Sequence, residues 1–260
     1  MRVAGGLSAT AKGVARAIVA IALPPRCPGC GAVTLDDHRF CLACWQSLDF
    51  LGDPCCAICG DPFDLDPGPD GHCGRCIADP PAYDRARAAV AYGPVARALA
   101  LKLKYGRRVE IAETIARQLD RLEVPPDAIV VPVPLHRWRI WRRGFNQAAL
   151  IGRAMARRRG LAFVPDLLIR TRATPMLRGL SPSQRARAVR GAFAANPARR
   201  EAVRGRRVVL IDDVHTTGAT IDACARVLRR AGASVTVLCW ARVASRDVDN
   251  GGAPPQLRSE

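Results

Sequence analysis

The chain has 260 residues, of which 49% are hydrophobic, a composition typical of a globular protein with one full domain and a smaller one. Forty Lys and Arg residues against 23 Asp and Glu residues give a net charge of +17, which favours polyanions, phosphorylated metabolites or anionic lipids as partners. No segment reaches the length of a transmembrane helix, so composition excludes a membrane-spanning protein but does not choose among the anionic partners.

Residues 1–23 are predicted to form an amphipathic N-terminal helix. Arg2, Lys12 and Arg16 precede an apolar run at 17–23. This run also resembles the core of a signal peptide, although it is too short to cross a bilayer. Because its apolar positions suit packing against the segment that follows, we expect a helix on a cytoplasmic protein.

Residues 24–80 contain cysteines with metal-ligand spacing. Nine of the eleven cysteines lie between Cys27 and Cys76, and eight of these nine form four C-x-x-C pairs. One such turn places two thiolates on an edge of a metal tetrahedron, and a second turn on a returning hairpin closes the opposite edge. The sequence therefore predicts a double zinc ribbon, although spacing alone leaves open which pairs share an ion. The predicted ligands are Cys27, Cys30, Cys41, Cys44, Cys56, Cys59, Cys73 and Cys76.

Both predicted sites are structural Zn²⁺ sites. Four thiolates fill a tetrahedral coordination sphere and leave no position for a reactive water. His38 and His72 lie near the cysteines in sequence, but a complete thiolate set makes them bystanders. Thiolates that bind zinc instead of pairing in disulfides indicate a reducing compartment, which again favours the cytoplasm.

Residues 81–245 are predicted to form an α/β domain with a mostly parallel sheet flanked by helices. Strands are expected at 85–92, 128–133, 161–164, 167–170, 207–211 and 234–240, and helices at 94–104, 109–122, 144–159 and 220–231. Strands that alternate with helices are typical of a sheet covered on both faces. The Gly- and Pro-rich stretch at 246–260 is predicted to be a disordered tail.

The sequence VVLIDDVHTTGAT at 208–220 is the strongest candidate for a binding site. Four apolar residues predict a buried strand, so Asp212 and Asp213 should emerge at the carboxyl edge of the sheet, where open α/β sheets bind ligands. The small and hydroxylated residues that follow lead into a helix and form a cradle of backbone N–H groups for a phosphate. Paired acids beside such a cradle suit a ribose 5-phosphate, because the carboxylates can accept hydrogen bonds from its hydroxyls or hold Mg²⁺.

Two further features of the sequence are open to more than one interpretation. His215 could act as an acid or base, but its place one residue before the cradle favours a solvent-facing position. Trp138 and Trp141 lie among arginines, a pattern that fits either a surface for single-stranded nucleic acid or core packing. Cys224 and Cys239 are expected to be small buried hydrophobic residues.

The stretch at 208–220 resembles the phosphoribosyl pyrophosphate (PRPP) motif of type I phosphoribosyltransferases. From about residue 24 to residue 243 the chain also resembles the ComF-type proteins, which are associated with competence and DNA uptake and couple a double zinc ribbon to a phosphoribosyltransferase-like domain. The stretches that carry this second resemblance are PRCP (25–28), LKYG (103–106), VPVPLH (131–136), RGFNQA (143–148) and VRGAF (189–193).

These resemblances imply roles for particular residues. Asp212 and Asp213 would bind the ribose hydroxyls of PRPP, which carries Mg²⁺. The 5-phosphate would be bound by Thr216, Thr217, Gly218, Ala219 and Thr220, and the pyrophosphate by Lys104, His136, Arg137 and Arg143.

The segment 174–190 resembles the loop that closes over PRPP in this fold. Leu177 and Ala188 replace the Gln and Asn expected there, which removes two amide hydrogen-bonding groups and weakens the case for catalysis.

Three functions are compatible with these residues. The first is a phosphoribosyltransferase with an unidentified acceptor, linked to DNA uptake and competence or to nucleotide salvage. The second is a non-catalytic sensor of PRPP or nucleotides. The third is an accessory protein that binds single-stranded DNA and works with other DNA-uptake proteins.

Overall fold

The computed structural model describes residues 24–174 and 180–244. The predicted N-terminal helix at 1–23, the predicted tail at 246–260 and Leu177 therefore lie outside the described residues. Within the described part of the chain, each helix is too short or too polar to span a lipid bilayer.

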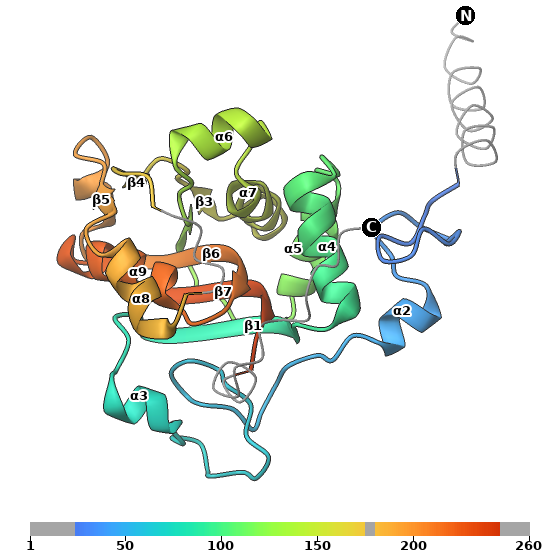
Figure 1. Cartoon of the computed structure of the whole chain (residues 1–260), viewed down its shortest axis with the longest axis horizontal. Coiled ribbons are helices and arrows are strands. Elements are labelled where there is room, and N and C mark those ends of the chain that lie inside the picture. The colour runs from blue at the N-terminus through green and yellow to red at the C-terminus, as the bar shows by residue number, and fades with distance from the viewer. Residues whose placement is uncertain (1–23, 175–179, 245–260) are drawn as a thin grey trace, which may run out of the picture.

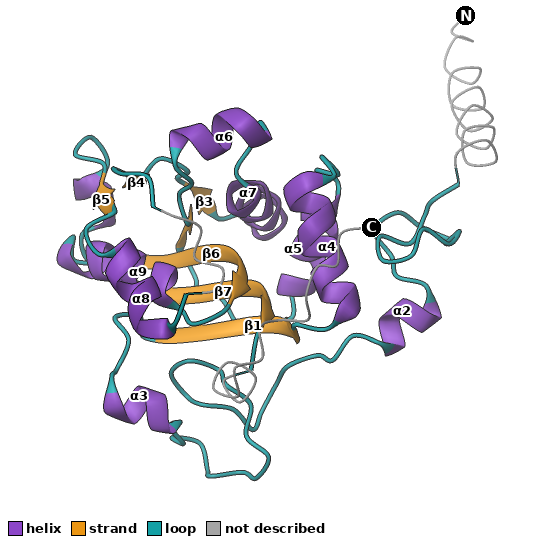
Figure 2. Cartoon of the chain, in the orientation of Figure 1, coloured by secondary structure: helices purple, strands orange, loops and turns teal. Residues whose placement is uncertain are grey.

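Five strands form the central sheet in the order β1-β7-β6-β2-β3 (Figure 2). They are β1 (Arg85–Ala91), β2 (Ile129–Pro132), β3 (Ala162–Phe163), β6 (Arg207–His215) and β7 (Ser234–Arg242). Every neighbouring pair in this sheet is parallel, which confirms the predicted fold class. The strand predicted at 167–170 is instead part of a separate antiparallel pair, in which β4 (Leu168–Arg170) faces β5 (Phe193–Ala195).

Helices cover both faces of the sheet (Figure 1). One face packs against α4 (Pro94–Tyr105), α5 (Ile111–Leu119) and α7 (Gln147–Arg159), and the other against α9 (Ala219–Arg230), which also contacts α8 (Pro182–Val189). A hydrophobic core lies on each face of the sheet, and alternate residues of β6 point into the two cores. Val208 and Leu210 belong to the core on the α9 side, and Val209 and Ile211 to the core on the α7 side. This explains the uninterrupted apolar run at 208–211.

Several short elements were not predicted. The helices α2 (Leu42–Gln46) and α3 (Gly74–Ala78) each begin directly after a cysteine, and a 3₁₀ turn spans Arg200–Val203. The helix α6 (Arg137–Arg143) lies in a stretch for which no helix or strand was predicted. Strand β6 continues four residues past its predicted end, because Asp212, Val214 and His215 still pair with β7. The acidic pair therefore lies within the last residues of a strand.

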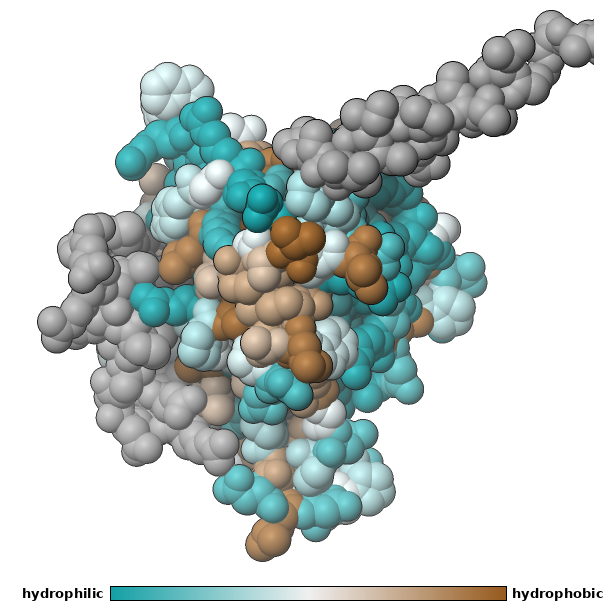
Figure 3. Space-filling model, turned by 90° about the vertical axis from the view of Figure 1, so that its right-hand side faces the viewer, coloured by the Kyte–Doolittle hydropathy of each residue, from teal (hydrophilic) through white to brown (hydrophobic). Residues whose placement is uncertain are grey.

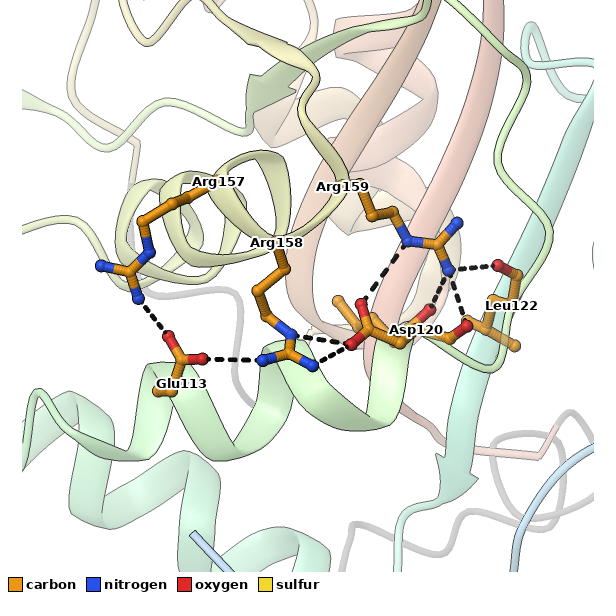
Figure 4. A network of polar contacts seen from close by, with 7 residues as sticks. Glu113, Asp120, Leu122, Arg157, Arg158 and Arg159 are labelled. Atoms are coloured by element: carbon orange, nitrogen blue, oxygen red, sulfur yellow. Dashed lines mark hydrogen bonds and ion pairs between the residues drawn. The ribbon is translucent and has the colours of Figure 1, made fainter. Parts of the chain in front are cut away.

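Three consecutive arginines at the end of α7 fasten that helix to α5 (Figure 4). Arg157 Nη2 lies 2.6 Å from Glu113 Oε2, and Arg158 Nη2 lies 2.5 Å from Asp120 Oδ2. Arg159 donates to the backbone carbonyls of Asp120 and Leu122 at 2.7 and 2.8 Å. Much of the basic charge of this segment is therefore used inside the fold, although each surface pair contributes only about 0.2–1 kcal/mol.

Candidate functional site

The eight predicted ligand cysteines form two clusters, and the structure shows which pairs come together. Cys27, Cys30, Cys41 and Cys44 form the first cluster, and Cys56, Cys59, Cys73 and Cys76 form the second. Within each cluster all Sγ atoms lie within 4.8 Å of one another. Successive pairs therefore share a site, and among the described residues neither His38 nor His72 belongs to a cluster.

Both clusters fit a tetrahedral zinc ion. Cys30 Sγ lies 3.5 Å from Cys41 Sγ, and Cys59 Sγ lies 3.6 Å from Cys73 Sγ. A tetrahedron with Zn–S bonds of about 2.3 Å has edges of about 3.8 Å, so little movement is needed to accept the ion. Burial acts to raise the pKa of Cys56, but hydrogen bonds from backbone N–H groups outweigh it and lower this pKa to about 6. The two cysteine-rich sites therefore suit structural zinc ribbons.

The acidic pair at the end of β6 faces both sides of the sheet. Asp213 is 4% exposed and lies 2.5 Å, through Oδ2, from Lys104 Nζ on α4. The side chain of Gln147 on α7 forms a second hydrogen bond to Asp213 and itself accepts one from Arg143 Nη1 at 2.5 Å. Burial acts to raise the pKa of Asp213, but the ammonium of Lys104 outweighs it and holds this pKa below its ordinary value. Asp213 is thus an ionised, fixed carboxylate.

Asp212 has a different environment. It is partly exposed, and its Oδ1 accepts a hydrogen bond from the backbone N–H of Asp213 at 2.9 Å. It forms no ion pair within the described residues. Burial, followed by the negative charge of Asp213, raises the pKa of Asp212 to about 8. A carboxyl group in this state can bind sugar hydroxyls, and a cation that reached it would favour its ionised form.

The predicted phosphate cradle is a partly exposed turn between β6 and α9. Gly218 has a φ of 76°, a left-handed conformation that favours glycine, and it is the N-cap residue of α9. Arg185 on α8 donates from Nη1 to Thr216 Oγ1 at 3.3 Å. A cavity of about 40 Å³ lies between Arg185, Asp212 and the turn. The turn, the N-terminus of α9 and a guanidinium thus line one cavity, an arrangement suited to an anion.

The interpretation of His215 as a solvent-facing residue is wrong, because its side chain is buried and only 2% of the residue is exposed. Its Nδ1 lies 3.3 Å from Nη1 of Arg242, the last residue of β7. Burial, and then the charges of Arg242 and Arg75, lower the pKa of His215 well below its ordinary value. The extension of β6 to this residue, which was not predicted, turns the ring into the protein.

The four predicted pyrophosphate ligands divide into two pairs according to their contacts. Lys104 and Arg143 belong to the network around Asp213. His136 is the N-cap residue of α6, where its Nδ1 accepts from the backbone N–H of Trp138 at 3.4 Å, and Arg137 lies over the Trp138 ring. Among the described residues, neither His136 nor Arg137 bonds to the acidic pair or to the turn.

The tryptophans of α6 lie on the surface of the protein. Trp138 is 59% exposed and Trp141 is 78% exposed, so the core-packing interpretation of both is wrong. Their rings meet edge to face, with centroids 6.3 Å apart.

Cys224 and Cys239 are buried, which confirms the prediction for both.

Sequence reasoning missed three residues that the structure brings to this site. Arg185 lies on α8, whose start carries a recognisable signal, because Ser181 and Gln184 form a capping box around Pro182. Gln147 follows the N-cap residue of α7 and belongs to the RGFNQA stretch, but the sequence predicted no role for its side chain. Arg242 carries no local signal, because only the pairing of β6 with β7 places it beside His215.

Comparisons with solved structures give weak similarity. An adenine phosphoribosyltransferase from Thermoanaerobacter pseudethanolicus is 20% identical, with a TM-score of 0.35, and the match covers 56% of this chain and 78% of that one. The protein TT1426 from Thermus thermophilus is 19% identical with a TM-score of 0.31, and the match covers 53% and 84%.

Sequence comparisons are more informative. The double zinc ribbon domain family matches residues 18–77, and the phosphoribosyl transferase domain family matches residues 157–252. The DNA utilization protein YhgH of Escherichia coli (strain K12) is 39% identical over 65% of this chain and 77% of its own length. Competence protein F of Haemophilus influenzae is 29% identical over 80% and 92%, and Competence protein ComFC of Bacillus subtilis is 24% identical over 80% and 85%. With both domains present and this degree of identity, the chain belongs to the ComF family.

Proposed function

We propose that the chain binds PRPP with Mg²⁺ at the end of β6 and transfers its phosphoribosyl group to an acceptor. The observation that carries the proposal is the position of Asp212 beside the turn at 216–220, with Arg185 lining the same cavity and donating to Thr216. A group with hydroxyls at one end and a phosphate at the other matches this pattern of acceptors and donors.

Each part of the site has a distinct task in this proposal. The backbone N–H groups of 216–220 bind the 5-phosphate, and Asp212 accepts from the ribose hydroxyls. Asp213 is held by Lys104 and Gln147 and so fixes the direction of the strand end. Departure of pyrophosphate needs positive charge more than a covalent nucleophile. Arg143, which donates to Gln147, and Arg185, which donates to Thr216, are cationic side chains that could supply it.

The residues present also fit Mg²⁺. Asp212 is a hard oxygen donor without an ion-pair partner among the described residues, which suits a cation that arrives with the polyphosphate. When bound, the ion supplies charge neutralisation at the pyrophosphate. The residues that would face it are Asp212 and, after release from Lys104, Asp213.

The test is calorimetric titration of the protein with PRPP and Mg²⁺, followed by a pyrophosphate-release assay with a panel of bases and amines. We expect binding in the wild type and a loss of about 100-fold in affinity in Asp212→Asn, because its carboxylate contacts are replaced by an amide. Binding without turnover for every acceptor would make the protein a sensor of PRPP or nucleotides. An absence of binding in the wild type would overturn the proposal.

A second candidate function, binding of single-stranded DNA, is favoured by α6. Trp138 and Trp141 present their rings to solvent beside Arg137, Arg142 and Arg143, and stacking on such rings contributes about 1–3 kcal/mol per base. Replacing both tryptophans by alanine should weaken binding of an oligothymidylate by at least about tenfold and leave PRPP binding intact. A double variant with unchanged DNA affinity, or wild-type binding that does not respond to salt, would exclude this surface.

The cellular context is also a proposal. The relatives are named for DNA utilization and competence, so we place the reaction in DNA uptake or in salvage of the nucleotides it yields. Eight cysteine ligands suit a reducing compartment, and we therefore place the protein in the cytoplasm.

A further inference from the structure

The second cysteine cluster is connected to the phosphate cradle by two buried side chains. Arg242, at the end of β7, is 2% exposed. It donates from Nη1 to the backbone carbonyl of Cys59 at 2.7 Å and from Nε to Asp61 Oδ1 at 3.1 Å, and its Nη2 lies 3.5 Å from Cys59 Sγ. The same Nη1 lies 3.3 Å from Nδ1 of His215. Arg242 therefore contacts a metal ligand on one side and the residue before the cradle on the other.

The orientation of His215 extends this connection to the cradle itself. Because a guanidinium only donates, Nδ1 of His215 must accept, and the ring proton lies on Nε2. Nε2 is buried and has no hydrogen-bond partner of good geometry among the described residues. It lies directly beneath the turn, since a Cβ built on Gly218 would be 3.1 Å from Nε2. The ring thus packs against the turn at Gly218.

The first cluster has a different attachment. Lys102 on α4 donates to the backbone carbonyls of Pro28 and Gly29, at 2.9 and 2.5 Å, and so holds the first ribbon against the outer helices. Among the described residues, no side chain bridges the first cluster and the turn at 216–220. The two clusters are therefore expected to differ in their effect on the cradle, although their ligand sets are the same.

We propose that His215 and Arg242 are positioning residues for the phosphate cradle, and that zinc in the second cluster sets the affinity of the cradle for a phosphate ester. The metal fixes Cys59, Cys59 fixes the guanidinium of Arg242, and the guanidinium fixes the ring on which Gly218 rests. The effect on affinity for a phosphate ester rests on the proposed function. The positioning of the turn at 216–220 by His215 and Arg242 does not, because it concerns only how well ordered the backbone of the turn is.

Two measurements on the full-length, zinc-loaded protein test the proposal. The first is hydrogen exchange of the backbone amides of 216–220 without ligand, with the amides of 208–211 as an internal reference. In His215→Phe and Arg242→Lys we expect exchange at 216–220 to accelerate by about tenfold and exchange at 208–211 to stay unchanged. The second is calorimetric titration with ribose 5-phosphate, in which both variants should bind about 10-fold more weakly.

The role of the metal is tested by a matched pair, Cys73→Ser and Cys41→Ser, which occupy the third ligand position of the second and first clusters. Cys73 is not among the contacts of Arg242, so this change removes metal without removing the guanidinium's partner. Each variant should contain one zinc ion instead of two. We expect Cys73→Ser to weaken ribose 5-phosphate binding as Arg242→Lys does and to accelerate exchange more at 216–220 than at 208–211, where loss of the second metal also lowers stability. Cys41→Ser should change both readouts by less than about twofold.

The outcomes separate this inference from the proposed function. A wild-type protein that does not bind ribose 5-phosphate overturns the proposed function, while the exchange experiment, which needs no ligand, still decides whether the residues order the turn. Unchanged exchange at 216–220 in both His215→Phe and Arg242→Lys overturns the positioning role. Equal effects of Cys41→Ser and Cys73→Ser overturn the role of the second metal. If Cys73→Ser does not fold, removal of one zinc ion by a chelator, identified by cysteine protection, replaces it.

Discussion

The two zinc ribbons have the same ligand pattern but very different surroundings. In the first, Cys30 is exposed, and the apolar side chains of Val33, Leu35 and Leu42 are 61%, 96% and 71% exposed. The face that is turned toward the viewer in Figure 3 shows a gathering of hydrophobic residues. In the second, Cys56 and Cys59 are 0% and 1% exposed and belong to the hydrophobic core under the sheet. The same sequence motif thus forms a peripheral module once and part of the domain core once.

The largest expected effect comes from breaking each cluster at its fourth ligand. Cys76→Ser should lower the free energy of unfolding by more than about 5 kcal/mol, because loss of the metal also opens the core that Cys76 belongs to. Cys44→Ser should lower it by only about 1–2 kcal/mol, since Cys44 lies outside the two cores of the sheet. Urea unfolding with zinc analysis checks this pair, and equal losses would mean that both ribbons are integral to the domain.

A second comparison uses two lysines of α4. Lys104→Met leaves the carboxylate of Asp213 buried without its ion pair and should cost about 3–5 kcal/mol. Lys102→Met removes only hydrogen bonds to carbonyls of the first ribbon and should cost about 1 kcal/mol. Thermal unfolding at neutral pH measures both changes. A larger loss for Lys102→Met would contradict the peripheral status of the first ribbon.

A third comparison uses the glycine that follows the second cysteine of each ribbon. Gly31 and Gly60 have φ values of 84° and 69°, so an alanine is strained at either position by about 1 kcal/mol. At Gly31 a Cβ meets no atom within 4 Å, but at Gly60 it would lie 2.5 Å from the carbonyl oxygen of Ala86 on β1. Gly60→Ala should therefore destabilise the protein by about 2–3 kcal/mol and Gly31→Ala by about 1 kcal/mol in denaturant unfolding. Similar values for the two variants would show that the second ribbon can move away from β1.

The smallest expected effect concerns Asp212 and depends on pH. Its pKa is raised from 3.8 to about 8, so the folded protein keeps a proton that the unfolded chain releases, and stability falls as the pH rises between these values. Asp212→Asn removes this loss and should raise the melting temperature by about 3–6 °C at pH 8, with no gain below pH 4. The same profile is expected in a Cys44→Ser background. A gain that is constant with pH would show that Asp212 is ionised at all of these values.

The sequence was sufficient for features that depend on local patterns. The C-x-x-C spacing predicted both clusters, and the alternation of apolar strands with helices predicted the parallel sheet and the position of the acidic turn. The strand end was misplaced because Asp212 and Asp213 are polar, and polar residues normally end a buried strand. Here Lys104 and Gln147, from two other helices, compensate the buried charge, and sequence periodicity cannot show such partners.

Features that depend on distant pairing could not be predicted. His215 is buried because Arg242 lies opposite it in the neighbouring strand. The position of Arg185 depends on α8, whose capping box was present in the sequence and was not used. The tryptophans of α6 could not be assigned to core or surface, because a short helix with apolar and basic residues on all sides has no clear buried face.

The contact between Arg242 and the second ribbon also fixes the order of events when the chain is made. Residues 56–76 leave the ribosome early, but the guanidinium that receives Cys59 belongs to Arg242, 183 residues later in the sequence. During synthesis, the surface of the second ribbon that later contacts Arg242 is therefore exposed to solvent. Its thiolates can react with zinc or with oxidants during this time. Binding of zinc at this stage protects those thiolates before β7 has been synthesised. A shortage of zinc would therefore affect nascent chains before it affected folded protein.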